Sequence, residues 1–201
     1  MKANTHSEKE ILIFNAVTKL INDGTKIHTI KVADIAKVAG IGKGTIYDYF
    51  KSKEEILEKA ILYHMNEELY KALEEIKSSC DFKSKYYKIL EMTQNNIVNY
   101  HSSANLLSSV GTYELKEVLV NNIEEVKNRE NIINKTINDI VNLGIKEGII
   151  KNQDDKTYQE QVFKSTIMGF AHYIVCENII DTLEIEKGKD RAYKLLIKGL
   201  N

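Results

Sequence analysis

The chain has 201 residues, of which 43% are hydrophobic and 28% charged, and it contains no proline. This length suits one large domain or two smaller ones, and the composition is that of an ordinary globular protein rather than a disordered chain. The formal net charge is only −1, but residues 1–53 carry +4 and residues 54–201 carry −5. A basic head on an acidic body is expected of a DNA-binding domain joined to an effector domain, although a difference this small also fits chance.

Cysteine usage and hydropathy exclude several classes of protein. The two cysteines, Cys80 and Cys176, lie far apart in the sequence and are too few for a disulfide framework or a structural zinc site. The N-terminus leads into a charged helix without the apolar core of a signal peptide. The longest apolar stretch, residues 167–176, is too short and too polar to span a bilayer. We therefore expect a cytoplasmic protein with no metal, no cofactor and no membrane contact.

Apolar residues recur at spacings of three and four along nearly the whole chain, which predicts an all-α protein. Two short helices are expected at about 32–38 and 43–50, and Ser52 and Glu55 predict a capping box that opens a long helix ending near residue 77. The first helix, at about 7–23, is expected to end before a left-handed Gly24 and to bury Ile11, Phe14, Val17, Leu20 and Ile21.

The remainder of the chain reads as helices separated by short polar turns. No internal repeat and no low-complexity linker is present. The expected helices lie at about 82–101, 104–110, 112–120, 122–147, 156–180 and 186–199, with a turn at residues 152–155.

The segment at residues 34–50 contains the most informative pattern. Ile35, Ala36 and Ala39 form a small apolar face, and Gly40 permits a tight turn between two short helices. Ile41, Ile46 and Phe50 are expected to anchor the second short helix. A short exposed helix gains little stability from burial, so its exposed hydroxyls and aromatic rings are better explained by contact with a DNA groove, where they can reach base edges and phosphates. The residues expected to point outward are Lys43, Thr45, Tyr47, Asp48 and Tyr49.

From Gly44 to Lys53 the chain reads Gly-Thr-Ile-Tyr-Asp-Tyr-Phe-Lys-Ser-Lys, which resembles the N-terminal signature of the TetR family of bacterial regulators. The match covers about residues 8–60, and the end of a long helix at Gly144–Ile150 is also similar. The resemblance implies a three-helix helix-turn-helix domain at 1–55 and a helical effector-binding and dimerisation domain at 56–201. It also implies a repressor that binds an inverted-repeat operator as a homodimer and is released by a small-molecule inducer.

The resemblance implies roles for individual residues at the DNA. Two positions depart from the family pattern, which usually has Ser or Thr before each helix of the motif: Gly42 is an acceptable N-cap, and Lys31 cannot cap but can reach a phosphate. Each position also fits a plain role as a solvated charge, a capping hydroxyl or a packing aromatic. The implied DNA-binding set is Lys31, Gly42, Lys43, Gly44, Thr45, Tyr47, Tyr49 and Lys53, with Lys43, Thr45 and Tyr47 in the major groove and Tyr49 and Lys53 on phosphates.

The C-terminal part contains polarizable, aromatic and hydrogen-bonding residues that in TetR-like proteins line an inducer cavity, although each also fits an ordinary core. These candidates are Met92, His101, Tyr113, Met168, Phe170, His172 and Tyr173. His101 and His172 have no partner at metal-ligand spacing. The resemblance implies a homodimer through apolar stripes on the last two long helices, namely Val162, Thr166, Gly169, Tyr173, Cys176 and Ile180 on one and Ala192, Leu196 and Leu200 on the other.

No catalytic motif is present. The sequence lacks a phosphate-binding Gly-Lys-Ser loop, a Gly-X-Ser-X-Gly elbow and a His-Glu-X-X-His pair, so we do not expect an enzyme. The main alternative is a helical binding or scaffold protein that does not bind DNA. Salt-dependent binding to duplex DNA would distinguish the two.

Overall fold

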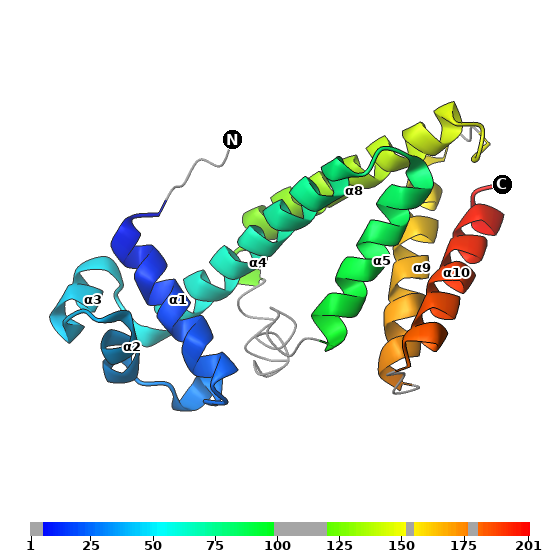
Figure 1. Cartoon of the computed structure of the whole chain (residues 1–201). Helices are drawn as coiled ribbons and strands as arrows, with labels where there is room; N and C mark the ends of the chain where they lie inside the picture. Colours follow the sequence, from blue (N-terminus) through cyan, green and yellow to red (C-terminus); the bar gives the residue numbers. More distant parts are fainter. Residues whose placement is uncertain (1–5, 99–119, 152–154, 177–180) are drawn as a thin grey trace. The chain divides into compact units, whose positions relative to one another are not determined.

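The computed structural model describes residues 6–98, 120–151, 155–176 and 181–201, and in these ranges it contains helices and turns but no strand (Figure 1). The predicted all-α class is confirmed. The helices expected at 104–110 and 112–120 fall almost wholly outside the described residues. The chain divides into two compact units: the first includes the described residues 6–69 and 120–123, and the second the described residues 70–98 and 124–201.

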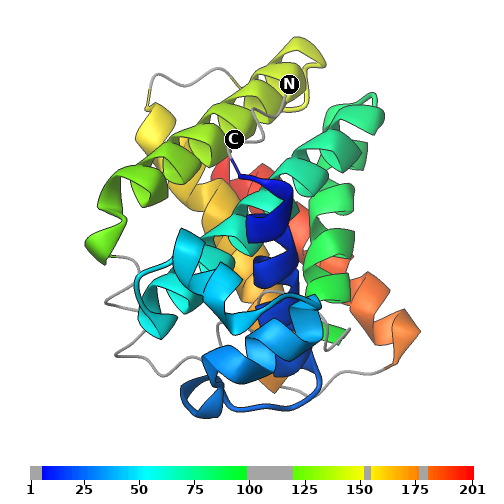
Figure 2. The same ribbon diagram turned by 90° about the vertical axis from the view of Figure 1, so that its left-hand side faces the viewer.

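The first unit is built around α1, which spans Glu8–Asn22. Ser7 caps this helix, because its Oγ accepts from the Glu10 amide at 3.3 Å while Glu10 Oε2 accepts from the Ser7 amide at 2.7 Å. Gly24 follows with a φ of 89°, the left-handed conformation that its lack of a side chain permits. The unit continues with the 3₁₀ turn η1 (Ile27–Thr29), α2 (Val32–Ala39), α3 (Lys43–Tyr49) and the start of α4 (Lys53–Ser78), as Figure 2 shows.

The buried face of α1 is broader than the predicted stripe. Ile11 and Leu20 are only half-buried, whereas the buried residues are Ile13, Phe14, Ala16, Val17 and Ile21. The reason is that α1 has neighbours on two sides. It packs against α2, and the Phe14 ring lies 5.7 Å from that of Phe50 and 5.2 Å from that of Tyr63 on α4.

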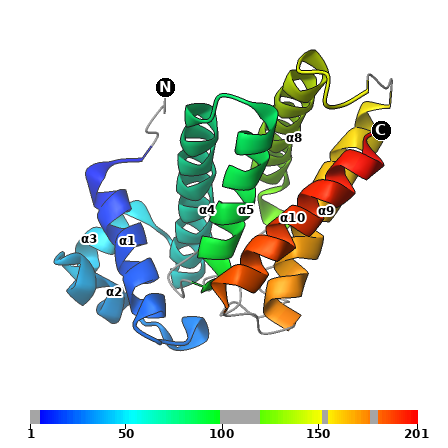
Figure 3. The ribbon, with the colours of Figure 1, turned by 45° about the vertical axis from the view of Figure 1, so that its right-hand side comes forward.

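The second unit contains the end of α4 together with α5 (Phe82–Val98), α8 (Ile123–Lys146), α9 (Lys156–Cys176) and α10 (Thr182–Gly199). In this unit α9 packs against both α5 and α10 (Figure 3). The phenol of Tyr86, fully buried on α5, donates a hydrogen bond to Thr166 Oγ1 on α9 at 2.8 Å. The core also includes Phe82, Leu90, Ile140, Phe163, Ile174 and Leu196.

Two helix ends in the second unit are determined by identifiable side-chain contacts. α10 begins at Thr182, four residues before the predicted start, because Asp181 Oδ1 accepts from the Glu184 amide at 3.0 Å and caps the helix. At the end of α8, a Cβ on Gly144 would lie only 2.8 Å from Ile150 Cδ1 and 2.9 Å from Phe82 Cδ2. Gly144 is therefore required by close packing, which explains the glycine in the Gly144–Ile150 sequence.

Candidate nucleic-acid interface

The turn between α2 and α3 depends on two glycines. Gly40 ends α2 with φ 69° and ψ 27°, a left-handed conformation in which its amide still bonds to the Ala36 carbonyl. Gly42 then occupies the N-cap of α3 in an extended conformation, without a side chain to cap the helix. The tight turn predicted at Gly40 is thus confirmed, and it brings the two short helices into contact.

The orientation of α3 follows from what lies beneath it. Ile46 is 0% exposed and Phe50 is 1% exposed, so the inner side of α3 is held in the core of the first unit. Tyr47 is 50% exposed and Tyr49 38% exposed. Lys43, Gly44 and Asp48 are also exposed, and Thr45 is half-buried. The outer face therefore presents an ammonium group, hydroxyls and aromatic rings on a rigid helix.

The charges at the edges of this surface are partly paired with backbone. Asp34 Oδ2 accepts from the Lys31 amide at 3.1 Å at the start of α2. The predicted capping box is incomplete, because the Glu55 carboxylate accepts from the Lys51 amide at 2.7 Å through Oε2 and not from the Ser52 amide. This hydrogen bond, helped by the Lys59 ammonium, lowers the pKa of Glu55. Ser52 still caps α4, since its Oγ accepts from the Glu55 amide at 3.1 Å.

Two of the predicted DNA-contacting lysines interact with their surroundings. The Lys43 ammonium lies 5.8 Å from the centre of the Tyr47 ring, within the range of a cation–π contact on the exposed face of α3. Lys53 Nζ donates to the backbone carbonyl of His28 at 3.3 Å, which joins the start of α4 to η1. Sequence reasoning did not identify His28, because nothing in the motif indicates that η1 lies beside Lys53.

Of the predicted inducer-binding residues that the structure describes, Phe170 and Tyr173 lie together beside Gly188, and the others do not join them in one cluster. Met92 is half-buried against the core of the second unit, and Phe170 is only 3% exposed. Met168 is 71% exposed and His172 is also exposed, so both lie on the outer side of α9. His101 and Tyr113 lie outside the described residues. An assignment of these side chains to an inducer cavity remains a prediction.

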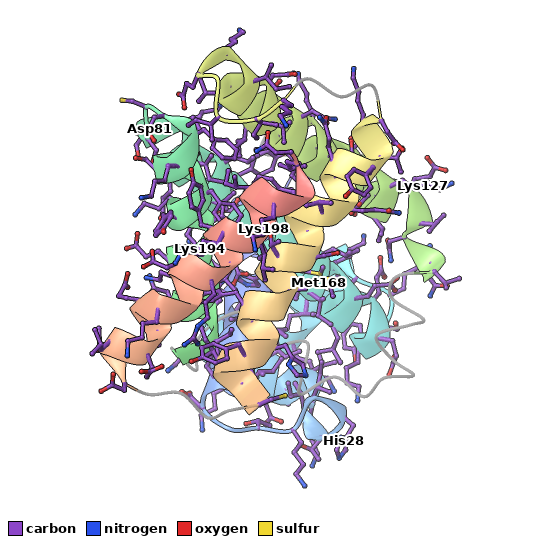
Figure 4. All side chains as sticks on the ribbon, turned by 90° about the vertical axis from the view of Figure 1, so that its right-hand side faces the viewer. His28, Asp81, Lys127, Met168, Lys194 and Lys198 are labelled. Carbon is purple, nitrogen blue, oxygen red and sulfur yellow. The ribbon has the colours of Figure 1, made fainter. Side chains whose placement is uncertain are left out.

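An apolar groove of about 640 Å³ lies on the surface between α9 and α10. The predicted stripe on α9 supplies part of it, but Leu196 and Leu200 of the predicted α10 stripe are buried in the core instead. The outward side of α10 is formed by other residues, and Figure 4 shows this side with Met168, Lys194 and Lys198 facing the viewer. Sequence reasoning missed the α10 residues that line the groove, namely Gly188, Arg191 and Leu195.

The described residues give little sign of other chemistry. Cys176 Sγ lies 3.3 Å from His172 Nε2, a partner that sequence spacing did not lead us to expect. Within the described ranges, however, no three His, Cys, Asp or Glu side chains come together to hold a metal ion. None of the helices in those ranges has the length and hydropathy needed to cross a bilayer.

Comparisons with protein families and with curated proteins match the chain to bacterial regulatory proteins. Residues 27–60 match the family model described as bacterial regulatory proteins, tetR family. The uncharacterized HTH-type transcriptional regulator YhgD of Bacillus subtilis (strain 168) is 34% identical over 84 residues, covering 41% of this chain and 43% of that protein. The fatty acid metabolism regulator protein of the same organism is 31% identical over 96 residues, covering 48% and 49%. The chain thus matches less than half the length of these relatives.

Comparison with solved structures covers nearly the whole chain. FadR from Bacillus subtilis, in complex with stearoyl-CoA, is 26% identical with a TM-score of 0.63, over 95% of this chain and 99% of that one. A TetR transcription regulator from Haloarcula marismortui has a TM-score of 0.70 at 17% identity, over 98% and 100%. At 17% identity, the likeness to the Haloarcula marismortui regulator shows a shared fold and nothing more.

Proposed function

We propose that the chain, as a member of the TetR family of bacterial regulatory proteins, is a transcriptional repressor. It binds an inverted-repeat operator as a homodimer and leaves the operator when a small-molecule inducer binds. The observation that carries the proposal is the exposed face of α3, where Lys43, Tyr47 and Tyr49 project from a helix anchored by Ile46 and Phe50. Such a face suits contact with phosphates and base edges in the major groove.

Selection of bound fragments from random duplex DNA tests this proposal. A symmetric dimer should select an inverted repeat with half-sites about 34–36 Å apart, one turn of DNA. Lys43→Ala should weaken binding to the selected site, whereas Lys127→Ala, which removes an exposed lysine of α8, should not. Failure to enrich any sequence, or equal loss with both variants, would contradict a specific operator.

The dimer is proposed to form through the groove between α9 and α10. Tyr158 and Leu195, which line this groove, are 44% and 60% exposed, and exposed apolar side chains gathered in this way mark an interaction surface. Gly169 lines the groove, and a Cβ there would meet no atom of this chain within 4 Å. The packing of one chain thus gives no reason for a glycine in mid-helix, while the close approach of a second copy gives one.

The mass of the protein in solution tests this interface. Leu195→Glu places a carboxylate in the groove and should convert a dimer to a monomer in light scattering. Leu183→Glu is the matched control, because Leu183 is 65% exposed on α10 but does not line the groove. A wild-type monomer at micromolar concentration, or dissociation by both variants, would refute this arrangement.

The inducer is proposed to be a fatty-acyl thioester. The support comes from two comparisons, one with the Bacillus subtilis fatty acid metabolism regulator protein and one with the solved structure of Bacillus subtilis FadR bound to stearoyl-CoA. Adding stearoyl-CoA to the protein–operator complex should release the DNA, and free coenzyme A should not. If stearoyl-CoA has no effect on a protein that still binds its operator, the ligand class is wrong and the DNA-binding function stands.

The route from inducer to DNA is proposed to run along α4. This helix contributes residues 53–69 to the first unit and 70–78 to the second. Asn122, just before α8, donates a hydrogen bond to Glu58 of α4, which ties the segment leading into α8 to this helix within the first unit. An inducer acts only by binding one arrangement more tightly, since equal affinity for both states shifts nothing.

A further inference from the structure

We infer that η1 and its flanking residues, 26–31, form a second contact with the DNA backbone, and that Lys53 is a positioning residue that holds this turn. The inference rests on the proposed function. The sequence assigned Lys53 directly to a phosphate, whereas its ammonium bonds within the protein to the carbonyl of His28 at 3.3 Å.

The turn is anchored from within. Ile27 is 5% exposed and Ile30 is 1% exposed, and both belong to the core of the first unit. The residues between and before them, Lys26, His28 and Thr29, are exposed. Two buried isoleucines three positions apart therefore fix which side chains of this short turn project into solvent. Figure 4 shows His28 on the outer side of the turn.

The turn also has its own hydrogen bonds, which make it a defined element. The Lys26 carbonyl accepts from the Thr29 amide at 2.9 Å and from Thr29 Oγ1 at 2.7 Å. The Ile30 amide donates to the Ile27 carbonyl at 3.3 Å. The bond from Lys53 adds a single tie from a distant part of the sequence, and it holds the turn against the first residue of α4.

Charge identifies the partner as a phosphate backbone. Lys26 and Lys31 flank the turn and are exposed, His28 within the turn is also exposed, and Lys53 joins the turn to α4. Among the acidic side chains close in sequence, Asp23 pairs with Lys19 at 3.2 Å, Asp34 accepts from the Lys31 amide at 3.1 Å, and Glu54 is exposed. Exposed cations beside a groove-reading helix bind phosphates and position that helix without reading bases.

Two measurements on the full chain test the inference. In the free protein, Lys53→Met should raise the rate of hydrogen exchange at the Thr29 and Ile30 amides roughly fivefold, the loss expected for one hydrogen bond. Lys51→Met, which removes another exposed lysine two residues away, should leave these rates unchanged. Lys53→Arg should restore protection, because it keeps a donor. Unchanged exchange in Lys53→Met would overturn the positioning role.

A double-mutant cycle on operator binding then separates positioning from direct contact. If Lys53 acts through the turn, Lys26→Ala should cost at least threefold less affinity in the Lys53→Met background than in the wild type. Strictly multiplicative effects would mean that each lysine contacts phosphate independently, and only this inference would fail. If the wild type does not bind duplex DNA at all, the proposed function fails and this inference with it.

Discussion

Tyr86 links α5 to α9, and its replacement by Phe should have opposite effects on stability at neutral and at alkaline pH. Its hydroxyl is fully buried and donates to Thr166 Oγ1 at 2.8 Å. At pH 8 the Tyr86→Phe variant should be less stable by about 1 kcal/mol, the net value of one hydrogen bond. Burial raises the pKa of Tyr86 from 10.0 to about 12, although the hydrogen bond to Thr166 opposes this rise.

A pKa that is higher in the folded state gives stability that is complete below pH 10 and is lost as the pH rises toward 12. The full loss is roughly 3 kcal/mol, and about half of it should have occurred by pH 11. The wild type should therefore lose its advantage near pH 11 and become the less stable protein above it. Urea unfolding of both proteins between pH 8 and pH 11.5 measures this crossing. A difference that stays constant over this range would refute the assignment of a buried, neutral phenol.

Three further predictions test the packing and the DNA surface. Gly144→Ala should lower the free energy of unfolding by about 1–3 kcal/mol, because its Cβ would lie 2.9 Å from Phe82. Gly44→Ala is the control and should raise the free energy of unfolding by up to about 1 kcal/mol, because no atom lies within 4 Å of the added Cβ. Equal effects of the two substitutions would contradict the close packing at Gly144. Gln159→Met should raise the free energy of unfolding by about 1 kcal/mol, since Nε2 is buried without a partner; a loss of stability would show an unseen one. Lys43→Ala should relax the preference for one symmetric pair of operator bases by about 1–3 kcal/mol, while Tyr49→Phe should weaken binding without changing the preference. If neither substitution changes the selected sequence or the affinity, α3 is not the recognition helix.

Local sequence was sufficient for the parts of the fold that local chemistry determines. Ser7 and Gly24 bracket α1 because capping and left-handed backbone depend on the residue itself. The turn at Gly40 and the anchoring of α3 by Ile46 and Phe50 follow in the same way. The outward face of α3 could therefore be predicted from the amino-acid sequence alone.

Features that depend on distant neighbours could not be predicted. Which side of α10 faces solvent is decided by α5 and α9, so Leu196 is buried while Leu195 forms part of the groove. The tie between Lys53 and His28 joins segments that no local pattern relates. Gln159 is only 4% exposed, although glutamine is usually found on the surface and a buried amide normally has a hydrogen-bond partner. Its burial could therefore not be predicted from the residue type.

The salt dependence of duplex binding tests the central claim most directly. The lysines on α3 and on either side of η1 should displace counterions from the DNA, so affinity for the selected operator should fall steeply between about 50 and 200 mM salt. Wild-type protein and Lys43→Ala, titrated with the same labelled duplex at several salt concentrations, give both the slope and its change. The account predicts a linear fall of log affinity with log salt that is shallower in the variant. Binding that does not respond to salt over this range, or no binding to duplex DNA at any salt, would contradict it and favour a helical protein with another partner.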